Sequence, residues 1–379
     1  MKKTIYALVL AGLMLLTTTV AVAGDTVKIG GIYPLSGYLS WLGEYYQKAG
    51  ELQVEMINEQ GGIDGKKVEL VIYDDQSSPQ EAARAVQRLI FKDQVIAITG
   101  TATAPISGAV SSICEKYGVP ALISSGYDLK PDKQPFVFNT AHPTYFAIAQ
   151  PVKYLKSKGK KKLALFMPIG SLGEIGIKNA KRAAKDFDME IVGIERFDVK
   201  APDVTAQLAK LRALDPDAVL SFCTGEPAAL VARNMAQLKF DVPLVVSHGN
   251  ATPGFLKLTA GLPVTIIVPS GKIMAPDAVS DDDPVKKVLV DFNNRHQAKY
   301  GEPANYFSGL VADAVMLTAK GAEISKSTDR AKVKEGIEKI ESVPGLGGIY
   351  NLSKTDHYGT SIDDMICLTI KDGKWVLLN

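Results

Sequence analysis

Short apolar runs alternate with longer amphipathic stretches from residue 26 onward. The apolar runs are rich in Val and Ile and read as buried strands, whereas the stretches between them carry apolar residues at helical spacing. Strands are predicted at VKIGGIYPL (27–35), KKVELVIYDD (66–75), QVIAITG (94–100) and VPALISS (119–125), and helices over 43–60, 79–93 and 105–117. This strand–helix order favours a parallel sheet with helices on both faces.

The same alternation starts again near residue 161. Strands are predicted at 161–168, 190–197, 217–224 and 242–249, with helices over 173–187, 203–214 and 226–239. Two successive α/β units of similar size predict two doubly wound lobes. The length of 379 residues agrees, because one compact core rarely holds so long a chain.

The last part of the chain follows a different pattern. Helices are predicted over 283–300, 305–323 and 328–341, followed by a glycine-bounded turn region, GGIYNLSKTDHYG (347–359). A β-hairpin is predicted within 363–378, turning at Asp372-Gly373. A chain that ends in this way after two α/β units is expected to cross back between the lobes over short hinges.

The first residues form a separate segment. A basic MKK start precedes the uncharged apolar stretch TIYALVLAGLMLLTTTVAVA, and small residues surround Ala23. These features predict a secretory signal peptide that is cleaved after Ala23. An uncleaved membrane anchor is the alternative, because the apolar run is almost long enough to span a bilayer. The Ala-x-Ala site favours cleavage, and we expect a free periplasmic protein.

The charge balance argues against some classes of binding partner, and the cysteine count bears on disulfide formation. Without Lys2 and Lys3 the chain has 41 basic and 41 acidic residues, so no basic field for nucleic acid or an anionic membrane is expected. Cys114, Cys223 and Cys367 are an odd number for an exported protein, which leaves at least one free thiol. We interpret all three as buried small apolar residues, with a Cys223–Cys367 disulfide as the alternative.

No catalytic or cofactor motif stands out. Gly170, Gly173 and Gly176 are spaced as GxxGxxG, not as the GxGxxG of a dinucleotide site, and no Walker A, GxSxG, HExxH or CxxC sequence occurs. Among the four histidines only His248 lies at the end of a predicted strand. The sequence therefore predicts a protein without metal or cofactor that is not an enzyme, and leaves a periplasmic hydrolase as an unfavoured alternative.

The N-terminal motifs resemble those of periplasmic binding proteins of the leucine/isoleucine/valine type, the receptors of ABC transporters. The resemblance rests on PLSG (34–37), the turn from Asn58 through Gly61-Gly62-Ile63 to Gly65, Asp74-Asp75, and Pro79 before an alanine-rich helix. YGVPALISS (117–125) and FSGLVADAVMLTAKGAEI (307–324) are similar to later parts of the same family. The likeness extends over nearly the whole mature chain.

The resemblance implies a type I periplasmic binding fold. Two Rossmann-like lobes would be joined by three crossover strands near 138–140, 267–270 and 347–350, with a ligand cleft between them. The expected boundaries are 1–23 for the signal peptide, 24–138 plus 270–347 for lobe one, and 139–268 plus 350–379 for lobe two. The expected partners are a small-molecule ligand and the inner-membrane permease subunits of an ABC transporter, with no nucleic acid, and the receptor is expected to be a monomer.

The resemblance also places a ligand site at the ends of strands, including the stretch TGTATAP (99–105). The expected ligand-binding residues are Trp41, Leu42, Thr103, Ala104, Ser125, Gly126, Tyr127, Tyr145, Leu172, Thr224, His248 and Asn250. Ala104 stands where the family's amino-acid binders commonly have a carboxylate-binding serine, and residues 247–250 lack the acidic side chain that balances a ligand ammonium.

These departures favour a small carboxylate or aromatic acid over an aliphatic amino acid as the ligand. Backbone N–H groups of 103–105 are expected to hold the carboxylate, and aromatic side chains its apolar body. Structural roles remain open: loop packing for Trp41, an exposed rim for Tyr127, core packing for Tyr145 and a hinge position for His248. A ligand sensor on the same fold, without transport, is the remaining functional alternative.

Overall fold

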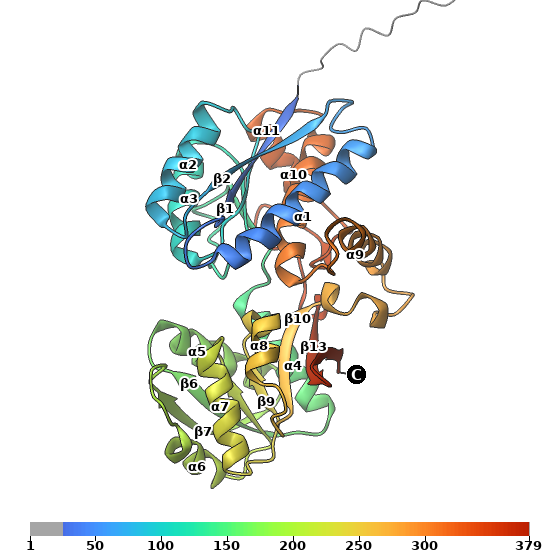
Figure 1. Ribbon diagram of the computed structural model, residues 1–379. Helices are drawn as coiled ribbons and strands as arrows, with labels where there is room; N and C mark the ends of the chain where they lie inside the picture. The colour runs from blue at the N-terminus through green and yellow to red at the C-terminus, as the bar shows by residue number, and fades with distance from the viewer. Residues whose placement is uncertain (1–25, 379) are drawn as a thin grey trace, which may run out of the picture.

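The computed structural model describes residues 26–378 and contains two lobes, each built around its own sheet (Figure 1). The sheet of lobe one has the strand order β2-β1-β3-β4-β5, and every pairing in it is parallel. Its strands are β1 (Val27–Tyr33), β2 (Val68–Asp74), β3 (Ile98–Gly100), β4 (Ala121–Ile123) and β5 (Val137–Asn139). The predicted parallel α/β class is therefore confirmed.

Helices cover both faces of this sheet. They are α1 (Ser40–Glu59), α2 (Pro79–Phe91), α3 (Ala104–Tyr117), α9 (Lys286–Tyr300), α10 (Tyr306–Ser325) and α11 (Arg330–Ile337). Leu122 packs into a cluster with α1, α10 and α11, whereas its neighbours Ala121 and Ile123 pack into a cluster with α2 and α3. This alternation is what a strand buried on both faces requires.

Lobe two contains a seven-stranded sheet of order β14-β13-β10-β9-β8-β6-β7. Its strands are β6 (Lys162–Pro168), β7 (Glu190–Phe197), β8 (Ala218–Ser221), β9 (Leu244–Val246), β10 (Ile266–Gly271), β13 (Met365–Lys371) and β14 (Lys374–Leu377). Its helices are α4 (Thr144–Ser157), α5 (Ser171–Asp186), α6 (Thr205–Arg212), α7 (Glu226–Gln237) and α8 (Pro253–Leu258). The predicted C-terminal hairpin is β13–β14, which joins the sheet antiparallel to β10.

The chain passes between the lobes three times, as the family resemblance implies. The first passage follows β5, the second leaves β10, and the third includes the short strand β12 (Ile349–Tyr350), which pairs with β11 (Val343–Pro344). The residues at which each lobe begins and ends remain a prediction. Between the second passage and α9, the chain forms 3-10 turns at Lys272–Met274 and Pro276–Ala278.

Some expectations from the sequence are corrected or lie outside the structure. The predicted signal peptide lies outside the described residues. Cys223 and Cys367 do not form the disulfide left open above, because both are buried free thiols, as is Cys114. Strand β5 was not predicted as an element of the sheet. Within residues 26–378, no helix has the length and apolar character needed to cross a membrane.

Candidate functional site

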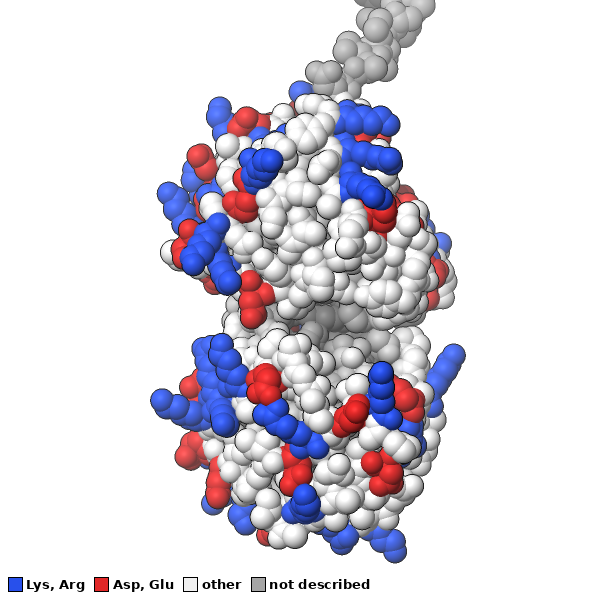
Figure 2. Space-filling view, turned by 90° about the vertical axis from the view of Figure 1, so that its left-hand side faces the viewer, with Lys and Arg blue, Asp and Glu red and all other residues white. Residues whose placement is uncertain are grey.

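The carboxyl ends of the parallel strands in both sheets face the waist between the lobes (Figure 1). In the space-filling view the waist is hollowed, and mainly uncharged residues border it (Figure 2). A cavity of about 570 Å³ lies there. It is lined from lobe one by Trp41, Leu42, Tyr45 and Phe307, and from lobe two by Thr224, Gly225, Gly249 and residues 252–254. No charged side chain contributes to this lining.

Aromatic rings form the lobe-one wall of this cleft cavity. Trp41 and Tyr45 are one turn apart at the start of α1, with ring centroids 6.4 Å apart in an edge-to-face arrangement. The Trp41 ring also meets Phe307 of α10 edge to face, at 5.7 Å. Trp41 remains 46% exposed although it is held from two sides. A large apolar surface is thus oriented and left open toward the cleft, as expected of a ligand contact.

Loops after β8 and β9 form the opposite wall. Asn250 is buried, and its amide nitrogen donates to the carbonyl oxygens of Cys223 and Ser247 while its amide oxygen accepts from Gly225 N–H. Both amide N–H groups and the amide oxygen of Asn250 are thus engaged inside lobe two, where they hold the backbone on either side of Thr224. A Cβ on Gly249 would lie 2.8 Å from Thr224 Cγ2, which explains why glycine occupies that position.

The stretch TGTATAP forms the turn between β3 and α3. Thr101 has φ of 77°, an uncommon conformation for a β-branched residue and one that often marks a functional turn. Its hydroxyl lies 2.7 Å from Ser107 Oγ, and Ser107 Oγ lies 2.6 Å from Ser125 Oγ. Ser125 therefore belongs to a buried chain of hydroxyls that joins the loops after β3 and β4.

The start of α3 is where anion-binding groups are predicted, and one part of that prediction is corrected. Thr103 is the N-cap residue, yet its side chain makes no capping hydrogen bond. The first-turn N–H groups of Thr103 and Ala104 have no partner within the helix. Pro105 was included in the expected cradle, but proline has no N–H, so only its two predecessors can serve. Ala104 and Gly126 are exposed beside this turn.

Nine of the twelve expected ligand residues lie outside the lining of the cleft cavity: Thr103, Ala104, Ser125, Gly126, Tyr127, Tyr145, Leu172, His248 and Asn250. Tyr127 packs against the α2–α3 cluster, and its hydroxyl accepts a hydrogen bond from Gln134. Tyr145 donates to Asp186 of α5, and Arg182 stacks over its ring at 3.8 Å. Leu172, 41% exposed at the start of α5, is also outside the lining. Their roles as ligand contacts remain predictions.

His248 lies between the cleft wall and the hinge. It follows Ser247 after β9, and its ring centroid is 5.9 Å from that of Tyr306 and 6.1 Å from that of Phe222. Its Nδ1 atom is buried without a hydrogen-bond partner among the described residues. Burial lowers the pKa of His248 to about 4, with nearby His142 as a smaller cause. His248 is therefore neutral at pH 7.

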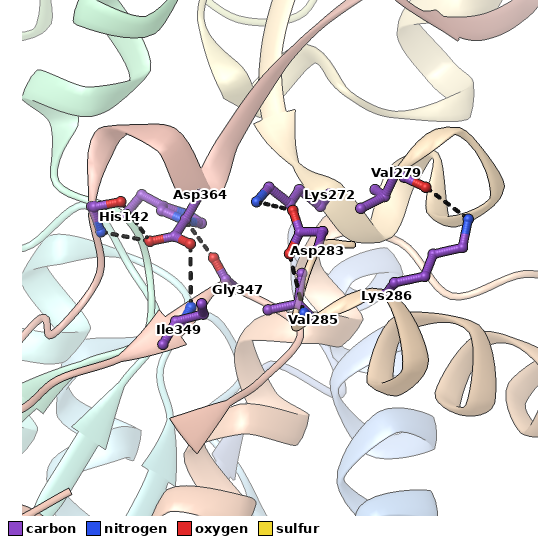
Figure 3. Close-up of polar contacts among 10 residues, drawn as sticks. His142, Lys272, Val279, Asp283, Val285, Lys286, Gly347, Ile349 and Asp364 are labelled. Atoms are coloured by element: carbon purple, nitrogen blue, oxygen red, sulfur yellow. Dashed lines mark hydrogen bonds and ion pairs between the residues drawn. The ribbon is translucent and has the colours of Figure 1, made fainter. Parts of the chain in front are cut away.

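A hydrogen-bonded cluster connects the chain passages behind the cleft (Figure 3). His142 Nε2 lies 2.8 Å from the Gly347 carbonyl oxygen, and His142 Nδ1 lies 3.3 Å from Tyr306 Oη. Asp364 accepts from Ile349 N–H at 3.2 Å. Burial lowers the pKa of His142, which favours the neutral ring. The first and third passages are thus joined through a neutral imidazole.

The sequence analysis missed several residues that the structure places at the cleft. Tyr45 follows Trp41 at i, i+4 spacing, so the helical pattern itself contained that signal. Phe307 follows Asn305, whose side chain caps α10, but its approach to Trp41 depends on tertiary packing. No group of three metal-ligating residues occurs between residues 26 and 378.

Comparison with known proteins shows which family and which sequences this chain is similar to. A family described as periplasmic binding protein matches residues 26–374. A leucine-, isoleucine-, valine-, threonine- and alanine-binding protein of Pseudomonas aeruginosa is 24% identical, over 84% of this chain and 83% of its own.

Solved structures show the same architecture. An extracellular ligand-binding receptor from Rhodopseudomonas palustris has a TM-score of 0.79 at 22% identity, covering 94% of this chain and all of its own. A branched-chain amino acid transporter substrate-binding protein from Streptococcus pneumoniae, solved with isoleucine, has a TM-score of 0.72 at 25% identity, covering 93% and 98%.

Proposed function

Because the chain belongs to the periplasmic binding protein family, we propose that it is a periplasmic receptor that captures a small organic ligand and delivers it to an ABC importer. The observation that carries this proposal is the uncharged, aromatic-lined cavity whose walls come from both lobes. Closure of the lobes over a ligand needs short connections and two facing sets of loops, and both are present. The ligand acts by binding the closed arrangement more tightly than the open one.

The proposed ligand is a small carboxylate, an aromatic acid or an amino-acid-like molecule, with an aromatic acid favoured. Trp41, Tyr45 and Phe307 offer ring surfaces to an apolar body. The N–H groups of Thr103 and Ala104 at the start of α3 suit a carboxylate, because a helix N-terminus attracts negative charge.

A ligand ammonium has no anionic partner in this cleft cavity. The nearby acidic residue Glu226 starts α7 and is paired with Arg233. A buried cation without a counter-charge is costly, so a zwitterionic amino acid would bind at a disadvantage. The His248 ring, which is neutral and makes no hydrogen bond within residues 26–378, offers a hydrogen bond from lobe two.

A thermal-shift panel tests the ligand class. Benzoate and phenylacetate are compared with leucine, valine and isoleucine, each at the same concentration. We expect a saturable rise in Tm with an aromatic acid, and loss of that rise in Trp41→Ala. Trp375→Phe, which alters the other tryptophan and leaves the cleft wall intact, is the matched control. A strong rise with an aliphatic amino acid, without one for the acids, contradicts the proposed ligand.

A further inference from the structure

A second cavity, here called the side cavity, lies beside the cleft. It has a volume of about 540 Å³, within the usual range of small-molecule sites. It shares Tyr45 and Pro253 with the cleft cavity, so these two residues stand between the two spaces. Its other walls come from the loop before α10 in lobe one, from the turns at 273–278, and from α8 and β14 in lobe two.

An ion pair and hydrogen bonds within the chain fix the floor of the side cavity. Residues 272–285 link β10 to α9, and Lys272 Nζ lies 2.6 Å from Asp283 Oδ2 in a largely buried ion pair. Lys286 Nζ donates to the carbonyl oxygens of Asp277 and Val279, at 2.9 and 2.8 Å. Figure 3 shows the Lys272–Asp283 and Lys286–Val279 contacts side by side. These bonds keep the floor in shape without a ligand.

The side cavity also touches the hinge. Met274 lines it, and Met274 Sδ accepts a hydrogen bond from Tyr306 N–H at 3.3 Å. Met274 packs against both the large α6–α8 core cluster of lobe two and the small cluster around Tyr306. An occupant would therefore contact both lobes and the second chain passage. A gap left by imperfect packing inside one lobe would not contact both lobes and a chain passage in this way.

The residues that line the side cavity indicate the chemical class of its ligand. Leu256, Ile273 and Met274 are apolar, and Tyr45 and Trp375 add one aromatic ring from each lobe. The only charged side chains in the lining are the carboxylates of Asp277 and Glu302. The Asp277 carboxylate makes no hydrogen bond or ion pair within residues 26–378. An apolar space with acidic edges favours an apolar cation and disfavours an anion.

We propose that the side cavity is a second ligand site, which binds a small aromatic monoamine. The ring lies among the apolar side chains and the ammonium faces Glu302 and Asp277. This preference is opposite in charge to that proposed for the cleft, and the inference does not rest on the proposed function. If the proposal for the side cavity fails, the proposed function of the cleft is unaffected, and the reverse also holds.

Trp375 fluorescence reports on this site. The chain has two tryptophans, so in Trp41→Phe the emission comes from Trp375 alone. The probe is 2-phenylethylamine at pH 7, with phenylacetate as the matched anion. We expect a saturable change with the amine, with Kd on the order of a millimolar for a ligand of this size, and none with phenylacetate.

Two glutamates provide a matched pair of variants in the same background. Both Glu44 and Glu302 pair with Lys48, at 2.6 and 2.7 Å, but only Glu302 lines the side cavity. Glu302→Gln should weaken the amine about three- to fivefold, as expected for a partly exposed ion pair, and Glu44→Gln should leave it unchanged. Asp277→Asn gives a second test if Glu302→Gln does not fold.

Three results would overturn the proposal. They are no saturable change up to tens of millimolar amine, an equal response to phenylacetate, or equal weakening by Glu44→Gln and Glu302→Gln.

Discussion

His142 Nε2 lies 2.8 Å from the carbonyl oxygen of Gly347, so one imidazole joins the first and third chain passages between the lobes. Gly271 of the second passage lies close to both rings, because a Cβ at this position would be 3.9 Å from His142 Cε1 and 3.2 Å from Tyr306 Cδ2. All three passages thus meet around His142. Any rotation of the lobes must leave these contacts in place or exchange them.

His142→Ala should therefore change both stability and lobe arrangement. It leaves the Gly347 carbonyl buried without a partner, at a cost of about 1 to 3 kcal/mol in the free energy of unfolding. Urea denaturation measures this cost, and small-angle X-ray scattering measures the radius of gyration. His296→Ala is the control, because His296 is also buried and bonded to a carbonyl, that of Glu302, but lies within lobe one. An unchanged radius of gyration in His142→Ala contradicts the hinge role.

The depressed pKa of His248 predicts acid sensitivity. In the unfolded chain the ring takes up a proton near its ordinary pKa of 6.5, whereas the folded protein resists until about pH 4. Stability from this group is complete above pH 6.5 and declines as the pH falls toward 4. Between pH 7.5 and 5 the loss should be about 1 to 2 kcal/mol. His248→Asn should remove this part of the pH dependence in urea titrations, and an identical slope in the variant would refute the assignment.

The contribution of Asp313 to stability should depend on pH in the direction opposite to that of His248. It is buried on α10 and accepts hydrogen bonds from Leu346 N–H, Gly347 N–H and Tyr350 Oη, while burial raises its pKa to about 6. The folded protein therefore binds this proton more readily than the unfolded chain. Its contribution to stability rises as the pH falls through 6 and is complete below the ordinary carboxyl value of 3.8. Asp313→Asn should abolish that rise, which differential calorimetry at pH 7.5 and 5 would detect. Equal pH dependence in both proteins would contradict it.

Much of this fold followed from the sequence, because strands and helices are local patterns. The positions of the predicted strand ends also indicated that Trp41, Leu42 and Thr224 would lie near one another, and all three line the cleft cavity. Phe307 was missed because its position depends on how α10 packs along α1, far away in the chain.

The other omissions have similar physical reasons. Strand β5 has only three residues after a polar loop, too few to show an alternating pattern. The hydroxyl chain from Thr101 through Ser107 to Ser125 joins separate loops, and no spacing rule predicts such a contact.

Two glycines of the cleft wall should respond differently to alanine. A Cβ on Gly249 would lie 2.8 Å from Thr224 Cγ2, whereas a Cβ on Gly254 would have no atom closer than 3.8 Å. Gly249→Ala should displace Thr224 and weaken ligand binding about tenfold, a loss of about 1.4 kcal/mol. Gly254→Ala should bind almost normally. Calorimetric titration with the acid that gives the largest thermal shift checks both, and equal affinities would show that the Thr224 loop does not contact the ligand.

Native mass spectrometry of the purified mature protein tests the central claim most directly, because a closed receptor retains its ligand. Our account predicts a bound small carboxylic acid, identified after denaturation. Trp41→Ala should lose this acid, since deleting an aromatic anchor typically costs about 2 kcal/mol or more. Trp375→Phe should retain it. A bound aliphatic amino acid, or a molecule held equally by Trp41→Ala, would contradict the account.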